Sequence, residues 1–256
     1  MKLGAAQLRP VAGDIAANTT KHLQLIELAI TQNADLVYFP ELSLTGYEPR
    51  LAKALAIAST DSYLDVFQQY SDTHNIIIGV GLPIAVGAQV QIGMVWFAPN
   101  APRRSYGKQQ LHADELPFFV PGNQQLVLTL DNRRLTPAIC YESLQVNHAD
   151  NAAQLRTDVY LASVAKPAGG LAKAMRHYPA IARKHSLYVI LSNCVGPNDD
   201  FVSVGQSAVW NDQGELLTQL DSESEGVVMV DMADGKAEMQ AMANIGCNNN
   251  AYQPCT

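Results

Sequence analysis

Short apolar runs alternate with helical patterns along the whole chain, and this alternation restricts the fold more than any other feature. The run 76–81 is apolar throughout, as expected of a strand that is buried on both faces of a sheet. Residues 131–134 are predicted to form a hairpin turn between two such runs. Strands are predicted at 3–8, 36–39, 76–81, 90–97, 126–130, 135–139, 159–164, 188–192, 208–210, 215–220 and 226–230.

Helical patterns lie between these strands. Asp14 is a suitable N-cap for the first helix, and further helices are expected at 62–74, at 151–156 and at 171–181. Pro179 should kink or split the last one, because proline lacks the backbone N–H that a helix interior requires. Since strands and helices alternate without a linker or a repeat, we expect one α/β domain over residues 1–256, with sheets covered by helices. From about residue 244 we expect a tail that is mobile or docks on a partner subunit.

Composition limits the partners of the chain. Hydrophobic residues make up 48% and charged residues 16%, which is enough for a sizeable core. The net charge of −7 and the pI near 5.3 argue against nucleic acid and anionic membranes as partners. No run approaches the ~18 apolar residues of a membrane span, and the N-terminal run is too short for a signal peptide. The four cysteines form no CxxC pair, which excludes a zinc ribbon and fits a reducing cytoplasm.

Cys140 lies where the apolar strand 135–139 meets a polar segment with the character of a helix start. The free N–H groups and the dipole of a helix start favour the thiolate form of cysteine. A neighbouring backbone N–H can also hold an oxyanion. The alternative is a buried structural cysteine, because free cysteine is among the most buried residue types.

Three more polar residues occupy similar positions. Glu41 follows the strand 36–39, and partial burial would raise the pKa of its carboxyl toward that of a general base, unless it turns to solvent. Lys108 follows an aromatic–glycine pair and would lower a thiol pKa and stabilise an oxyanion, unless it is a solvated surface lysine. Glu115 leads into an apolar, proline-rich loop, where it could orient Lys108 or the substrate, or could be a helix-end charge.

Together these segments resemble the nitrilase superfamily of carbon–nitrogen hydrolases, in its amidase-like branch. The resemblance covers nearly the whole chain, and its segments occur in the order and spacing of that family. The matching segments are Phe39-Pro40-Glu41, Lys108, Ile139-Cys140-Tyr141-Glu142, the Glu-x-x-x-Phe-x-Pro-Gly run at 115–122, the Asn-x-x-Gly at 193–196, and the Gly-x-Ser and Gly-Glu at 205–207 and 214–215.

The resemblance implies a four-layer αββα sandwich and a catalytic set of Glu41, Lys108 and Cys140, with Glu115 in support. It implies that Cys140 attacks a small amide or N-carbamoyl compound, forms a thioester and releases ammonia or an amine, with no metal or organic cofactor. It also suggests a homodimer or higher homo-oligomer that pairs through the helical layer. The remaining oxyanion- and substrate-binding residues that we expect are Tyr141, through its backbone N–H, Tyr47 and Phe119.

Several alternatives stay open. The same site could hydrolyse nitriles, or the fold could carry a catalytically idle binding protein. The run after Cys140 lacks the Arg-Phe-Pro-Glu of many family amidases, which puts an acid-bearing substrate in doubt. The length leaves no room for an ATP-binding synthetase module, so we do not expect a fused amide-transfer enzyme. A metal site around Cys194 lacks ligand spacing. A Cys–His pair would have to use His112, His148, His177 or His185.

Overall fold

The computed structural model of the chain describes residues 1–242, and within this range the strands form two large sheets and one short hairpin. The tail expected from about residue 244 lies outside the described residues. In order across the first sheet lie β15 (Ala237–Ala241), β14 (Gly226–Asp231), β1 (Lys2–Gln7), β2 (Leu36–Tyr38), β3 (Ile77–Val86), β4 (Gln89–Phe97) and β5 (Arg104–Gly107). Across the second lie β13 (Leu216–Gln219), β12 (Ala208–Trp210), β9 (Tyr188–Asn193), β8 (Val159–Val164), β7 (Arg133–Ile139) and β6 (Leu128–Leu130), and the hairpin is β10 (Val195–Pro197) with β11 (Val202–Val204).

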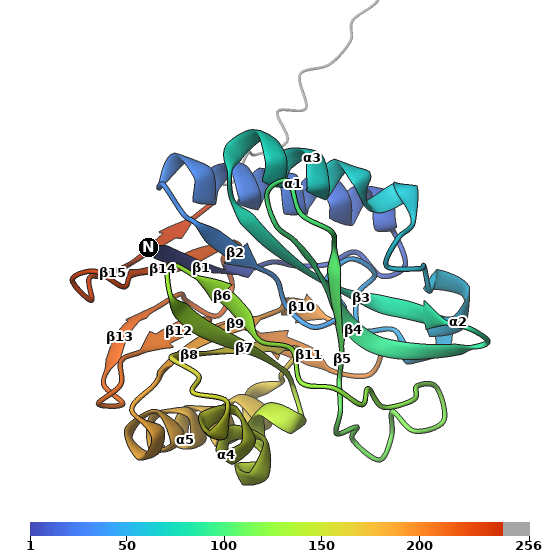
Figure 1. Cartoon of the computed structure of the whole chain (residues 1–256). Coiled ribbons are helices and arrows are strands. Elements are labelled where there is room, and N and C mark those ends of the chain that lie inside the picture. The colour runs from blue at the N-terminus through green and yellow to red at the C-terminus, as the bar shows by residue number, and fades with distance from the viewer. Residues whose placement is uncertain (243–256) are drawn as a thin grey trace, which may run out of the picture.

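Helices cover the outer face of each sheet (Figure 1). Helices α1 (Ile15–Thr31) and α3 (Asp65–His74) pack on the first sheet, and α4 (Val146–Gln154) and α5 (Ala168–His185) pack on the second. The two inner faces meet in a shared hydrophobic core. This is the four-layer αββα sandwich that the sequence led us to expect. The shorter helical segments are η1 (Pro49–Leu51), α2 (Ala52–Leu55), η2 (Ser62–Leu64) and η3 (Glu142–Leu144), and no helix within residues 1–242 is long and apolar enough to cross a membrane.

Buried hydrogen bonds join the two sheets directly. The Tyr38 hydroxyl on β2 donates to the Ile190 carbonyl on β9 at 2.6 Å. Near the end of β8, the Ser163 hydroxyl donates to the carbonyl of Phe39 at 2.9 Å. Strands β1, β2 and β3 run parallel, as do β7, β8 and β9. The link between Ser163 and Phe39 therefore places the carboxyl ends of β2 and β8 at one edge of the sandwich, where parallel α/β sheets usually carry their sites.

Two local predictions are confirmed, the N-cap of the first helix and the hairpin turn at 131–134. The Asp14 side chain accepts a hydrogen bond from the Ala17 N–H at 2.9 Å, as an N-cap should. Asp131 and Asn132 join β6 to β7 with φ values of 51° and 62°. Left-handed backbone at two successive residues is typical of a type I′ hairpin turn.

Two helix predictions need correction. The helix expected at 151–156 is α4, which begins earlier at Val146 and ends at Gln154. The last helix, α5, is continuous from Ala168 to His185, so Pro179 does not split it. Proline removes one helical hydrogen bond, but buried residues on both sides of it share one face on the second sheet and hold the two halves in line. These residues are Leu171, Ala174, Tyr178, Ile181 and Ala182.

The strand end expected before Lys108 is that of β5, whereas three short strands have no counterpart in the sequence-based prediction. They are β15 at the edge of the first sheet, and β10 and β11 in the hairpin. Each has three to five residues, too few to show a clear alternation of polar and apolar side chains. Each pairs antiparallel with a strand that is adjacent in the chain, β15 with β14 and β10 with β11.

Candidate active site

Glu41, Lys108 and Cys140 follow the strands β2, β5 and β7, and the two sheets bring them together at one edge. The Lys108 ammonium donates to Glu41 Oε1 at 2.8 Å and to Glu115 Oε1 at 2.6 Å. Burial acts to lower the Lys108 pKa, but the surrounding negative charges of Glu41, Cys140 and Glu115 raise it overall. Lys108 is therefore held as a permanent cation at the centre of the cluster.

Glu115 is fixed from three sides. Besides Lys108, the Tyr47 hydroxyl donates to Glu115 Oε1 at 2.9 Å, and the backbone N–H of His112 donates to Oε2 at 2.8 Å. Of the two roles that the sequence left open for Glu115, the geometry matches the orientation of Lys108.

The Glu41 carboxyl has the environment of a general base. The side chain is buried, and its Oε2 has no hydrogen-bond partner within the described chain. Burial raises the Glu41 pKa, the Lys108 charge opposes this shift, and the Glu115 charge adds to it. A carboxylate with a raised pKa and an unpaired oxygen can accept a proton from a neighbouring group.

The turn at Cys140 is strained and tightly fixed. Cys140 has φ of 46°, in the left-handed region that non-glycine residues seldom adopt. Its N–H donates to the Ser163 carbonyl at 2.9 Å, and its own carbonyl accepts from the Ser143 hydroxyl at 2.6 Å. Cys140 thus stands at the end of β7, where it lines the cavity and also packs against the core.

The expected helix start at Cys140 is not formed. A single 3-10 turn, η3, begins at Glu142, and the helix α4 begins only at Val146. The thiol is also not ionised by its surroundings. Burial and the Glu41 charge raise the Cys140 pKa to about 11, although Lys166 and Lys108 act in the opposite direction. The prediction of a helix-stabilised thiolate is therefore wrong.

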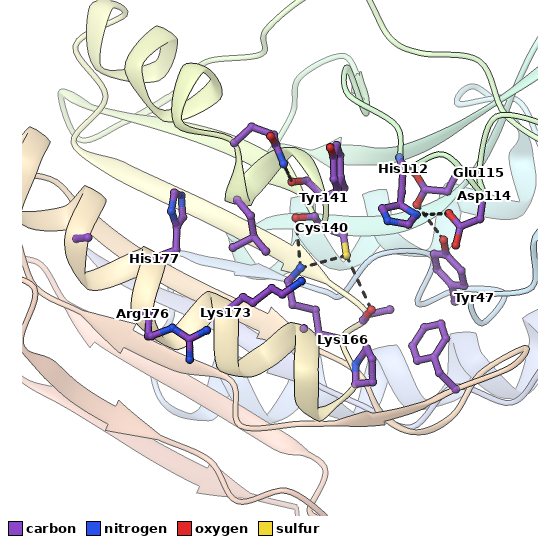
Figure 2. Close-up of a pocket in the computed structure, with 17 residues that line it drawn as sticks. Tyr47, His112, Asp114, Glu115, Cys140, Tyr141, Lys166, Lys173, Arg176 and His177 are labelled. Carbon is purple, nitrogen blue, oxygen red and sulfur yellow. Dashed lines mark hydrogen bonds and ion pairs between the residues drawn. The ribbon is translucent and has the colours of Figure 1, made fainter.

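A pocket of about 830 Å³ opens above the Cys140 sulfur (Figure 2). Glu115 and Tyr47 line it on one side, and residues from the beginning of α5 line it on another. Glu41 and Lys108 lie beneath its floor, withdrawn from solvent. The full lining is Tyr47, His112, Asp114, Glu115, Cys140, Tyr141, Leu144, Gln145, Ala165, Lys166, Pro167, Gly170, Lys173, Arg176, His177, Ala180 and Phe201.

The family model for carbon–nitrogen hydrolases matches residues 2–239. The chain belongs to the carbon–nitrogen hydrolase family. The NitN amidase from Nesterenkonia sp. AN1 has a similar structure, with a TM-score of 0.84 and 25% identity, over 91% of this chain and 93% of that amidase. A nitrilase from Pyrococcus abyssi is 27% identical over 244 residues, which cover 91% of this chain and 90% of the nitrilase.

The other relatives are longer proteins. The glutamine-dependent NAD(+) synthetase of Acinetobacter baylyi is 26% identical over 241 residues, and that of Thermotoga maritima is 25% identical over 247 residues. The aligned regions cover 86% and 91% of this carbon–nitrogen hydrolase but only 42% of each synthetase. The chain thus spans less than half the length of these relatives.

Two predicted binding residues of this carbon–nitrogen hydrolase lie in different environments. Tyr141 is partly exposed, lines the pocket, and places its ring against that of His112 with centroids 5.2 Å apart. Phe119 is buried in the core between the sheets and does not line the pocket. The Phe119 N–H donates to the Glu115 carbonyl at 2.9 Å, so its place in the site is to close the turn that carries Glu115.

Sequence reasoning assigned no role to Glu142, which connects the segments that carry Lys108 and Cys140. Its Oε1 accepts from the Ile139 N–H and the Tyr106 hydroxyl, both at 2.7 Å, and its Oε2 accepts from the Gln109 N–H at 2.6 Å. Burial raises the Glu142 pKa to about 7, and these hydrogen bonds oppose the shift. Glu142 therefore ties the segment after Lys108 to the strand before Cys140. A carboxylate two residues after Cys140, close behind the apolar strand 135–139, was the available signal.

Lys166, which the sequence analysis did not single out, lies against the Cys140 sulfur. It comes two residues after β8, is nearly fully buried, and has its Nζ 3.5 Å from the Cys140 sulfur. Its position shortly after an apolar strand, like that of Glu41, was the signal that could have identified it.

The alternative chemistries find no matching geometry in the described residues. No hydrogen bond links a histidine to the Cys140 sulfur within residues 1–242, and no group of three or more His, Cys, Asp or Glu side chains there could hold a metal. Cys194 is buried at the end of β9, with its sulfur 4.0 Å from the Glu41 carbonyl. Three of the four candidate histidines are engaged elsewhere, His112 with Asp114, His148 with Tyr160 and Tyr106, and His185 with Asp150. His177 lines the pocket but makes no hydrogen bond to the Cys140 sulfur in the described part of the chain.

Proposed function

We propose that this carbon–nitrogen hydrolase cleaves small linear amides or N-carbamoyl compounds through a thioester at Cys140, and releases ammonia or an amine. The observation that supports this most strongly is the buried cluster of Glu41, Lys108 and Glu115 beneath the sulfur at the floor of the pocket. The similarity to the NitN amidase over nearly the whole of both chains agrees with this reaction class.

In the first half of the proposed reaction, Glu41 accepts the proton of the Cys140 thiol. The resulting thiolate forms a carbon–sulfur bond with the amide carbon, and the carbonyl electron pair moves onto oxygen. The Lys108 ammonium and the backbone N–H of Tyr141 hold this oxyanion. Because the thiol pKa is raised to about 11, attack depends on this proton transfer.

In the second half, Glu41 gives its proton to the leaving nitrogen, because an amide anion is too basic to leave unprotonated. The carbon–nitrogen bond breaks and a thioester remains on Cys140. Glu41 then takes a proton from water as the water oxygen bonds to the thioester carbon. The carbon–sulfur bond breaks, the electron pair returns to sulfur, and Glu41 gives its proton to the thiolate as the carboxylic acid leaves. Glu115 keeps the ammonium of Lys108 in position through both halves.

The test is a panel of matched amides, N-carbamoyl compounds and nitriles, with ammonia release as the readout. We expect turnover of amides or N-carbamoyl compounds and an acyl adduct on Cys140 in the mass spectrum of quenched protein. Cys140→Ala should show neither. Preference for the nitriles would favour the activity named for the Pyrococcus abyssi relative, and no turnover of any class would favour an idle binding protein.

A second candidate is the hydrolysis of the side-chain amide of a zwitterionic amino acid such as glutamine. Lys173 and Arg176 line the pocket from α5, and neither has a carboxylate within 4.0 Å in the described part of the chain. Asp114 lines the pocket from the segment that carries Glu115. A substrate with a carboxylate and an ammonium would match these opposite charges. The names of the longer relatives, which are glutamine-dependent synthetases, point to the same substrate.

This candidate is tested by comparing glutamine with butyramide, which lacks both charges. If it is correct, Lys173→Met and Arg176→Met will raise the KM for glutamine and leave the KM for butyramide unchanged. Lys173 and Arg176 on α5 would then bind the substrate carboxylate, in place of the arginine that many family amidases carry after the cysteine. Equal effects on both amides would contradict recognition of the carboxylate.

We also propose a homodimer or higher homo-oligomer that pairs through the helical layer. Val146, at the start of α4, is 56% exposed, and such an apolar side chain on an outer helix is compatible with an interface. Native mass spectrometry of the full chain measures the state directly, and a monomer at micromolar concentration would contradict it.

A further inference from the structure

Lys166 occupies a fixed position beside the nucleophile. Its backbone N–H donates to Asn193 Oδ1 at 2.9 Å, and its carbonyl accepts from the Val204 N–H at 3.2 Å. The side chain is 4% exposed, and its Nζ lies 3.5 Å from both the sulfur and the carbonyl oxygen of Cys140 (Figure 2). The ammonium is thus held by the backbone against the sulfur.

The charge of Lys166 has no carboxylate partner. No Asp or Glu oxygen within residues 1–242 lies within 4.0 Å of its Nζ, whereas the Lys108 ammonium is paired with both Glu41 and Glu115. A buried ammonium is costly unless an anion is nearby. The sulfur of Cys140 is the nearest group that can become an anion during the reaction, and it does so each time Glu41 removes its proton.

We propose that Lys166 is a further catalytic residue, whose ammonium stabilises the Cys140 thiolate at the two points where sulfur carries negative charge. The first is the moment after proton transfer to Glu41, before the carbon–sulfur bond forms. The second is the break of that bond in thioester hydrolysis, when the electron pair returns to sulfur. Lys166 remains protonated throughout, and every proton moves through Glu41. This role rests on the proposed function.

The two lysines then have separate tasks. Lys108 is matched by two carboxylates beneath the floor, which leaves it to position Glu41 and to hold the oxyanion. Lys166 faces the sulfur from the pocket side and is itself part of the lining. Of the two lysines, Lys166 also has the larger lowering effect on the thiol pKa. Loss of Lys166 should therefore change the reactivity of the thiol itself.

The test is the rate at which iodoacetamide alkylates Cys140 across the pH range, followed by mass spectrometry. In Lys166→Met the apparent thiol pKa should rise by about one unit and the rate at pH 7.5 should fall about tenfold. Lys166→Arg, which keeps the charge, should restore most of the rate. The matched control is Lys184→Met, which removes an exposed lysine from the far end of α5 and should leave the rate unchanged.

Thermal unfolding separates this role from a structural one. Because Lys166→Met removes a buried charge without a carboxylate partner, its Tm should equal or exceed that of the unsubstituted protein while the thiol reacts more slowly. If Lys166→Met does not fold, the alkylation profile and the Tm of Lys166→Gln are compared with those of the unsubstituted protein instead. An unchanged alkylation profile in the folded variants would overturn the assignment. A slowed thiol in a protein that hydrolyses no amide would overturn the proposed function and leave the effect of Lys166 on the thiolate established.

Discussion

Lys108 Nζ donates a hydrogen bond of 2.8 Å to Glu41 Oε1, although 67 residues separate the two and neither side chain reaches solvent. Either charge alone would be costly at this depth, so each is stable there because of the other. Glu115 adds a second carboxylate to the same ammonium. Two negative charges thus share one positive charge, and this imbalance contributes to the raised pKa of Glu41.

Substitution Lys108→Met should leave Glu41 and Glu115 buried side by side without a cation. We expect loss of amide turnover and a fall of about 3–5 kcal/mol in the free energy of unfolding, as for other broken buried ion pairs. Urea unfolding and ammonia release measure the two effects. Lys53→Met, on an exposed part of α2, is the control and should change neither. Unaltered stability of Lys108→Met would contradict the buried pairing.

Substitution Glu41→Gln should separate base catalysis from thiol reactivity. We expect turnover to fall by roughly 10²–10⁴-fold, because the proton acceptor is lost. The Cys140 pKa should fall at the same time, because the Glu41 charge is one of the causes that raise it. Steady-state kinetics and the pH profile of alkylation test the two halves, with the exposed Glu223→Gln as control. A thiol pKa that rises in Glu41→Gln would show that the carboxylate favours the thiolate.

Substitution Glu142→Gln should loosen the link between the Lys108 and Cys140 segments. A glutamine amide has one acceptor oxygen and would turn its NH₂ group toward a backbone N–H donor. We expect a loss of about 2–4 kcal/mol in stability and at least tenfold lower turnover, since hydrogen bonds to charged groups contribute about 1.5–3 kcal/mol each. Urea unfolding and ammonia release would check this, and full activity in the variant would contradict a positioning role.

Substitution Tyr38→Phe tests the hydrogen bond between the two sheets and should affect stability without affecting turnover. It leaves the Ile190 carbonyl without its 2.6 Å donor in the core, which should cost about 1–3 kcal/mol of stability. Turnover should stay within about twofold, because the pocket contains neither residue. Tyr63→Phe, at a 43% exposed position, is the control and should be neutral in both measurements.

His22 should make the fold sensitive to acid. Burial lowers its pKa from 6.5 to about 4, partly offset by its contact with the Asn18 carbonyl. The unfolded chain then binds a proton at higher pH than the folded chain does. Stability from this group is therefore complete above about pH 6.5 and is lost as the pH falls toward 4. Urea unfolding at a series of pH values should show a smaller decline for His22→Gln than for the unsubstituted protein. The exposed His112→Gln should keep the full decline.

The sequence alone determined the α/β class and most of the strands, and it proposed Glu41, Lys108, Glu115 and Cys140 as site residues through a family resemblance; their catalytic roles stay predictions. The fold class and the strands could be predicted because their signals are local: an apolar run between turn residues is recognised without knowledge of its neighbours. The same locality explains the errors. A helix start after Cys140 was expected from the polar residues there, but the chain forms a single 3-10 turn. The Glu142 carboxylate in this turn accepts a hydrogen bond from the Ile139 N–H.

Only the tertiary structure decided what surrounds the sulfur. The packing of two sheets carries Lys166 to within 3.5 Å of Cys140, buries Phe119 away from the pocket, and joins Glu142 to the segment after Lys108. It also sets the thiol pKa, because burial and charge at the sulfur depend on four residues that are separate in the sequence, Glu41, Lys108, Glu115 and Lys166. Sequence order records which side chains exist, but the sign and size of an electrostatic effect follow from distance and solvent exposure, and folding fixes both.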